Sequence, residues 1–122
     1  MDLDGSQADG IGMQGDPLLE TRVILFDYDS SVLRSEYNGK LNELGDYLMK
    51  NPDTFLVVGG FADSRGDDEY NLWLSKRRAL SIKTYLLGTY NIDGDRIVLQ
   101  WFGEQNPAAD NSTSEGRRLN RR

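Results

Sequence analysis

One strand-to-helix stretch decides the fold of this chain, Thr54–Leu87, which reads TFLVVGGFADSRGDDEYNLWLSKRRALSIKTYLL. Its first residues are rich in valine and phenylalanine and end in a glycine pair, which is typical of a buried β-strand. The acidic residues 67–69 then stand where negative side chains complement the amide dipoles of a helix N-terminus. The stretch therefore predicts a strand over residues 54–60 and a helix from about residue 67 to residue 87.

Strands and helices keep alternating on both sides of this stretch. Upstream, residues Arg22–Tyr28 are β-branched and aromatic and predict a buried strand. From Ser35 leucines recur at helical spacing until Asn51-Pro52 ends the helix. Downstream, residues Arg96–Phe102 predict a third strand, apolar on both faces and therefore largely buried. A short final helix is expected over residues 115–119.

The order strand, helix, strand, helix, strand predicts an α/β sandwich with helices packed on the sheet. A chain of 122 residues is most simply one domain that buries a core without disulfides, and we expect it to span residues 21–122. Residues 1–20 carry acidic residues and glycines but no basic residue. They lack the basic start and apolar run of a signal peptide, so we expect a disordered leader.

The composition excludes several classes of function. The chain has no cysteine and no histidine, which removes thiol catalysis, histidine-based triads and zinc sites of the usual ligand set. The net charge of −6 opposes sequence-independent binding to nucleic acid. The basic end of the chain, Arg117, Arg118, Arg121 and Arg122, is expected to be solvated or salt-bridged. We therefore expect no nucleic-acid partner and no cofactor or metal.

A carboxylate and a guanidinium occupy adjoining elements of the central stretch. Asp63 follows the predicted strand, and Gly66 allows the turn backbone to approach a ligand closely. On the predicted helix, Arg78 shares a stripe with Ser75 and Ile82, so we expect it to be half buried. Two interpretations stay open. Arg78 either packs on the core rim and pairs with a structural aspartate, or forms with Asp63 a two-point clamp for a zwitterion.

Six short motifs follow one another along the chain. They are Phe26-Asp27-Tyr28-Asp29, Gly60-Phe61-Ala62-Asp63-Ser64-Arg65-Gly66, Asn71, Leu74-Ser75-Lys76-Arg77-Arg78-Ala79, Gly103-Glu104-Gln105-Asn106-Pro107 and Asn120-Arg121-Arg122. In order and spacing they resemble OmpA-like peptidoglycan-binding domains over residues 22–122. Glu69-Tyr70-Asn71 and the double arginine look most like the peptidoglycan-associated lipoprotein branch. The resemblance implies a β-α-β-α-β core with helices packed on a mixed sheet.

The resemblance also implies a function, the noncovalent binding of the diaminopimelate-containing peptide stem of peptidoglycan. Such a domain anchors the outer membrane or an envelope complex to the cell wall from the periplasm, without a catalytic group. The free end of diaminopimelate carries an ammonium and a carboxylate. By this resemblance Asp63 would accept the ammonium, and Arg78 would hold the carboxylate through its planar fork, which lysine cannot imitate.

The resemblance assigns supporting roles to further residues. The other predicted ligand-binding residues are Tyr28 and Asp29 as a wall of the pocket, Ala62 in the turn and Asn71 as a brace for the turn. Phe61 stands where the family usually has histidine, which removes a hydrogen-bonding ring beneath the turn. Relatives continue beyond the Asn-Arg-Arg motif into a last strand, which we expect to be missing or truncated here. Periplasmic envelope proteins are further expected partners, and a membrane would be reached only through an upstream anchor.

Two alternatives come from other classes of protein. Val23–Val32 also resembles the first motif of haloacid-dehalogenase phosphotransferases, in which Asp27 would attack phosphate and Asp29 would handle the leaving group with Mg²⁺. Asp67-Asp68 would then be its metal-binding pair, but the chain is short for that fold and this pair fits a helix start better. A protein-interaction module without wall binding would use Trp73 or Trp101 as an anchor, although we expect tryptophans to belong to the core.

Overall fold

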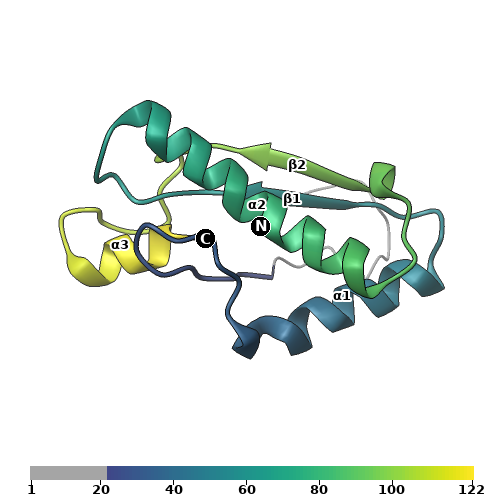
Figure 1. The fold of residues 1–122 in the computed structure, drawn as a ribbon. Coiled ribbons are helices and arrows are strands. Elements are labelled where there is room, and N and C mark those ends of the chain that lie inside the picture. The colour runs from purple at the N-terminus through teal and green to yellow at the C-terminus, as the bar shows by residue number, and fades with distance from the viewer. Residues whose placement is uncertain (1–21) are drawn as a thin grey trace.

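The sheet of this domain is small and parallel. The structure, a computed structural model, describes residues 22–122, so the predicted leader over residues 1–20 lies outside the described part. Within residues 22–122 the sheet contains two strands, β1 (Leu56–Gly60) and β2 (Ile97–Trp101). Their carboxyl ends point the same way (Figure 1). Both correspond to predicted strands, which are confirmed but slightly shorter than expected.

Helices connect and cover these strands. α2 (Asp68–Thr89) links β1 to β2 and packs against both, as a parallel connection requires. α1 (Asn38–Lys50) follows the 3₁₀ turn η1 (Ser35–Tyr37) and packs against α2 (Figure 1). A second 3₁₀ turn, η2 (Gly94–Arg96), leads into β2, and α3 (Ser114–Asn120) comes last. No helix in this part of the chain has both the length and the apolar character that a membrane span requires.

The α2 N-terminus forms as its acidic residues predict. Asp67 is the N-cap, and its side chain accepts a hydrogen bond from the amide of Glu69 at 3.2 Å. The long helix that follows carries Asn71 and Arg78, two of the predicted site residues. The predicted α/β class is therefore confirmed, since a parallel strand, a helix and a second parallel strand follow one another in the chain.

The predicted strand over Arg22–Tyr28 is wrong. This segment buries Ile24 and Phe26, as its apolar residues indicate, but forms no regular strand. The amide of Phe26 donates to the carbonyl of Arg121 at 2.9 Å, and a strand needs such pairing along its whole length. The mixed sheet is not found either, because the sheet formed by residues 22–122 is entirely parallel.

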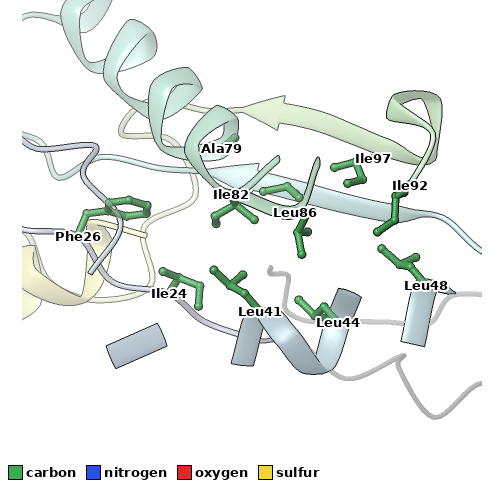
Figure 2. Close-up of a cluster of buried hydrophobic side chains, with 11 residues drawn as sticks. Ile24, Phe26, Leu41, Leu44, Leu48, Ala79, Ile82, Leu86, Ile92 and Ile97 are labelled. Atoms are coloured by element: carbon green, nitrogen blue, oxygen red, sulfur yellow. The ribbon is translucent and has the colours of Figure 1, made fainter. Parts of the chain in front are cut away.

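The hydrophobic core lies between α1, α2 and the sheet (Figure 2). It consists of Ile24, Phe26, Leu41, Leu44, Leu48, Val58, Ala79, Ile82, Leu86, Ile92 and Ile97. The leucine face predicted for the first helix is thus confirmed. The predicted burial of both faces of β2 is wrong, because Ile97 is buried whereas Val98 is 41% exposed. In the described part of the chain α2 packs on the sheet and leaves the Val98 face open.

β1 ends in glycine because α2 crosses it at close range. A Cβ atom added to Gly60 would stand 1.9 Å from the backbone oxygen of Ser75. Ser75 is fully buried, and its hydroxyl accepts a hydrogen bond from the amide of Gly103 at 3.0 Å. The segments after β1 and β2 are therefore both held against the first half of α2.

Candidate ligand-binding site

A pocket of about 350 Å³ opens beside the first half of α2, where the turn after β1 meets residues 28 and 29. The structure brings all six predicted ligand-binding residues into its lining. They are Tyr28, Asp29, Ala62, Asp63, Asn71 and Arg78, and the structure adds Arg65, Gly66, Tyr70 and Leu74. The sequence thus predicts the location of the pocket, while the role of each residue in binding stays a prediction.

Arg78 is the most deeply buried charged side chain in the pocket lining, with 1% of its surface exposed. Its Nε donates to the carbonyl of Ser30 at 2.8 Å, and its Nη2 donates to the carbonyl of Asp27 at 3.1 Å. Its Nη1 donates to the carbonyl of Phe61 at 2.9 Å. The turn over residues 27–30 and the segment after β1 are therefore both held to α2 by one guanidinium.

The charged guanidinium of Arg78 donates its hydrogen bonds to neutral carbonyl groups. Burial, with the nearby charge of Arg121 acting in the same direction, lowers the pKa of Arg78 to about 10, so the guanidinium is charged at neutral pH. Its hydrogen bonds within residues 22–122 go to carbonyl oxygens, and the structural aspartate of the first interpretation is not bonded to it. Buried charges are stable when paired, so this site favours an anionic ligand group.

Asp63 supplies the opposite charge in the same pocket and is 4% exposed. Its Oδ1 accepts from the backbone amide of Arg65 at 3.0 Å and from Nε of Arg65 at 3.3 Å. Its Oδ2 accepts from Nη2 of Arg65 at 3.1 Å and from Nη1 of Arg121 at 3.5 Å. Burial acts to raise the pKa of Asp63, but these hydrogen bonds outweigh it and hold the pKa below its usual value.

Arg65 was missed by the sequence analysis although it lies two residues from Asp63. Its guanidinium lies 3.9 Å from the ring centroid of Tyr28 while it pairs with Asp63. Gly66 follows with φ +92°, a left-handed conformation that glycine adopts without steric cost, and so turns the chain towards α2. The available signal was the Asp-Ser-Arg-Gly turn itself, which places a cation beside the carboxylate.

A second side of the pocket is closed by Tyr70, which the sequence analysis also missed. The hydroxyl of Tyr70 donates to the carboxylate of Asp29, whose backbone has φ +54° in the left-handed region that aspartate tolerates. Tyr70, Leu74 and Arg78 are spaced four residues apart, so they share one face of α2. That spacing was the signal that could have identified Tyr70.

Asn71 lines the pocket and lies close to two neighbouring segments. It is 2% exposed, and its amide nitrogen donates to Glu104 at 3.5 Å. This hydrogen bond joins α2 to the loop after β2, and the Oδ1 of the same side chain lies near the turn, 3.7 Å from where a Cβ atom added to Gly66 would stand. The side chain of Asn71 therefore lies between the loop after β2 and the turn, and its role as a brace for the turn stays a prediction.

The ring of Phe61, the residue at which the resemblance led us to expect histidine, lies outside the pocket lining. The ring stacks on Phe102 with 4.8 Å between centroids, and the guanidinium of Arg122 lies 3.8 Å from its centroid. Only the carbonyl of Phe61 serves the site, as the acceptor for Arg78. Any residue supplies that carbonyl, so the exchange of the ring leaves the hydrogen bond to Arg78 in place.

The basic end of the chain contributes to the site more than expected. Arg118 is exposed and pairs with Glu115 at 2.7 Å, as the sequence predicts. Arg121 is also salt-bridged, but its side chain is only 13% exposed and its partner is Asp63. Its Nε donates in addition to the carbonyl of Phe26 at 2.9 Å. Arg121 thus joins the pocket carboxylate to the first described segment of the chain.

The two tryptophans lie outside the core, so their predicted burial is wrong. Trp73 is 52% exposed and Trp101 is 38% exposed. With Glu69, Leu72 and Lys76 they line a second hollow of about 270 Å³, next to the first turns of α2. They are exposed because they stand where the outer face of α2 meets the end of β2.

The family is decided by the match of the sequence to known proteins. The sequence model of the OmpA family matches residues 25–121. This chain belongs to the OmpA family. Outer membrane porin F of Pseudomonas aeruginosa is 38% identical over 99 residues, which cover 81% of this chain and 28% of the porin. The chain thus spans less than a third of that relative. The peptidoglycan-associated lipoprotein of Buchnera aphidicola is 30% identical over 105 residues, which cover 83% of this chain and 60% of the lipoprotein.

Solved structures agree with this assignment. The peptidoglycan-associated lipoprotein from Burkholderia pseudomallei superposes with a TM-score of 0.76 at 26% identity, over 80% of this chain and 82% of that one. The cell wall anchor of the T6SS from Pseudomonas aeruginosa superposes with a TM-score of 0.64 at 31% identity, over 80% of this chain and 69% of that one. The predicted OmpA-like fold is confirmed.

The phosphotransferase alternative finds no support in these observations. The carboxylate of Asp27 accepts a hydrogen bond from Arg34 at 2.9 Å and is exposed. Asp67 caps α2, as described above. Among residues 22–122, acidic side chains are nowhere gathered in threes to hold a metal ion. The carboxylate of Asp27, the nucleophile in that alternative, is therefore engaged in an ion pair with Arg34.

Proposed function

We propose that this domain binds the peptide stem of peptidoglycan noncovalently, through the zwitterionic end of diaminopimelate. The observation that carries this proposal is the presence of two buried, opposite charges, Asp63 and Arg78, in one pocket of about 350 Å³. The ligand ammonium is held by the carboxylate of Asp63. The ligand carboxylate is held by Arg78. This side chain has five N–H donors and uses three of them on the carbonyls described above, which leaves two for the ligand.

The charge pattern favours a zwitterion over a ligand with a single charge. A ligand that carries only a negative charge would be attracted by Arg78 but repelled by Asp63. A ligand that carries only a positive charge would be attracted by Asp63 but repelled by Arg78. Exposed Tyr28 and Asp29 form the wall past which the rest of the peptide leaves the pocket. The binding is an equilibrium that uses no reacting group, so we assign no chemical reaction to the domain.

Membership of the OmpA family supports a role in attachment to the cell wall. One relative is named for its association with peptidoglycan and a structural neighbour is described as a cell wall anchor. We infer that this domain lies in the periplasm and links an outer-membrane component or an envelope complex to the wall. We further propose that periplasmic envelope proteins are partners of the domain and that it does not itself contact a membrane.

The proposal is tested by sedimentation with purified, insoluble peptidoglycan of the diaminopimelate type. The wild-type domain is expected in the pellet, while the isosteric variant Asp63→Asn and the variant Arg78→Lys stay in the supernatant. Arg77→Lys is the matched control, because this arginine neighbours Arg78 on α2 but is exposed. If the wild-type domain stays in the supernatant, or if Asp63→Asn sediments as well as the wild type, the proposed function is wrong.

A further inference from the structure

The carboxylate that would receive the ligand ammonium is already engaged in the free protein. A carboxylate has about four acceptor positions. The amide, Nε and Nη2 of Arg65 and the Nη1 of Arg121 donate to the oxygens of Asp63. A ligand ammonium can therefore reach Asp63 only after one of these donors has left.

Arg65 is the donor that can leave with little rearrangement. Its side chain is 41% exposed, whereas the side chain of Arg121 is 13% exposed and is held in addition by the carbonyl of Phe26. The Arg65 guanidinium also covers the ring of Tyr28 at 3.9 Å, so it lies over two parts of the pocket lining at once. Its rotation into solvent would uncover both.

We propose that the Arg65 guanidinium occupies the ammonium subsite of this pocket and is displaced from Asp63 by the ligand, which makes Arg65 a specificity-determining residue. This inference rests on the function proposed above. A ligand must bring a cationic group that replaces the guanidinium, so a stem whose amine is blocked leaves Arg65 in place. The affinity of the domain is set by the difference between two cations competing for one carboxylate.

The test measures the affinity of a soluble diaminopimelate-containing muropeptide by calorimetry. Removing the competitor in Arg65→Ala is expected to tighten binding about 3- to 10-fold, as judged from the usual strength of exposed ion pairs and cation–π contacts. Arg65→Lys keeps a competing cation without the planar fork and is expected to lie between the two. For the same muropeptide with its diaminopimelate amine acetylated, wild type and Arg65→Ala are expected to bind equally weakly.

Arg118→Ala is the matched control for this test. Arg118 also makes two hydrogen bonds to one carboxylate, that of Glu115 at 3.0 and 2.7 Å, and is 47% exposed, but it lies outside the pocket lining. Its removal is expected to leave the affinity unchanged. Thermal unfolding of each variant verifies that the domain stays folded.

The outcomes separate this inference from the proposed function. If the wild type binds and Arg65→Ala binds equally or more weakly, Arg65 is not a competitor, and the wall-binding function stands. If Arg65→Ala binds where the wild type does not, the ligand fails to displace Arg65 from Asp63 in the wild type, and both this inference and the proposed function of the wild-type domain are overturned. If neither protein binds, the wall-binding function is wrong and the inference is overturned with it.

Discussion

At the scale of single residues, the pocket depends on an arginine that holds its walls together and that we propose as the partner of the ligand carboxylate. Arg78 donates to the carbonyls of Asp27, Ser30 and Phe61, which lie in three different directions around its planar fork. A lysine ammonium is a point charge on a flexible stem and cannot reach these acceptors together. We therefore expect the identity of this side chain to matter for folding as well as for the proposed binding.

We predict that Arg78→Lys loses more than tenfold in affinity for a diaminopimelate muropeptide. Its free energy of unfolding should fall by about 2–4 kcal/mol, because buried carbonyls lose their donor. Calorimetric titration and urea denaturation measure the two effects. Arg77→Lys, on the exposed face of the same helix, should stay close to the wild type in both. Wild-type affinity in Arg78→Lys would contradict the assigned role of the planar fork.

We predict that the affinity for the ligand falls at low pH because Asp63 becomes protonated. The hydrogen bonds from Arg65 outweigh burial and hold the pKa of Asp63 below its usual value. The ionised carboxylate therefore contributes stability and ammonium affinity above the unfolded pKa, and both are lost as the pH falls through the folded pKa. In Arg65→Ala the pKa of Asp63 should rise, so the affinity should decline at a higher pH than in the wild type.

Carbon-detected NMR of the Asp63 carboxyl group measures this shift directly, with and without ligand. Arg118→Ala should leave the pKa of Asp63 where it is, since Arg118 pairs with Glu115. A pKa of Asp63 that does not change in Arg65→Ala would show that Arg65 does not engage the carboxylate in solution.

At the scale of elements, the close crossing of β1 and α2 positions the pocket. The residues that follow Gly60 carry both the carbonyl that Arg78 binds and the carboxylate of Asp63. An added Cβ at Gly60 would stand 1.9 Å from the Ser75 oxygen, so α2 would have to move away from the strand. Any such movement also changes the distance between the two charges of the pocket.

We therefore predict that Gly60→Ala lowers the free energy of unfolding by about 1–3 kcal/mol, the usual range for overpacking, and weakens muropeptide binding. Gly39→Ala is the matched control, because nothing lies within 4 Å of an added Cβ at that position in α1. It should raise the free energy of unfolding by about 0.5–1 kcal/mol. Urea denaturation compares the two variants, and a Gly60→Ala domain as stable as the wild type would contradict the tight crossing.

Local sequence signals predicted the elements that local interactions build. The valines of β1, the leucines of α1 and the acidic residues that open α2 are local signals, and the three elements were predicted from them. The strand over Arg22–Tyr28 failed because a strand also requires a neighbour, which no local pattern specifies.

The difference between local signals and contacts across the fold also explains which site residues could be predicted. Asp63 and Arg78 were identified by their motifs and both line the pocket. The contact of Tyr70 with Asp29 and that of Arg121 with Asp63 join residues 41 and 58 positions apart in the chain. Such contacts depend on the assembled fold, so these partners were missed.

At the scale of the whole molecule, the end of the chain holds the pocket turn in place. Asn120 is fully buried, and its side chain makes hydrogen bonds to the backbone of Ala108 and Ala109 and to the side chain of Asn111. Oδ1 of Asn111 in turn accepts from the amide of Ser64 at 3.2 Å. This chain of contacts connects α3 to the residue next to Asp63.

We predict that Asn120→Ala lowers the free energy of unfolding by about 2–4 kcal/mol, because several buried polar groups lose their partner at once. It should also weaken muropeptide binding, since the Ser64 turn loses support. Chemical denaturation and calorimetry measure both effects, with the exposed Asn91→Ala as the control expected to match the wild type. Full stability in Asn120→Ala would contradict this role of α3.

The pairing of two buried charges for one zwitterion is tested most directly by a two-dimensional ¹H–¹⁵N NMR titration. The labelled domain is titrated with a diaminopimelate-containing muropeptide, beside folded Asp63→Asn and Arg78→Lys variants. Chemical-shift changes should cluster at the pocket, at Tyr28, Asp29, Asp63 and Arg78, and disappear in both variants. A wild-type spectrum that stays unchanged at millimolar ligand, or changes that persist in both variants, would contradict the assignment of this pocket to the peptidoglycan stem.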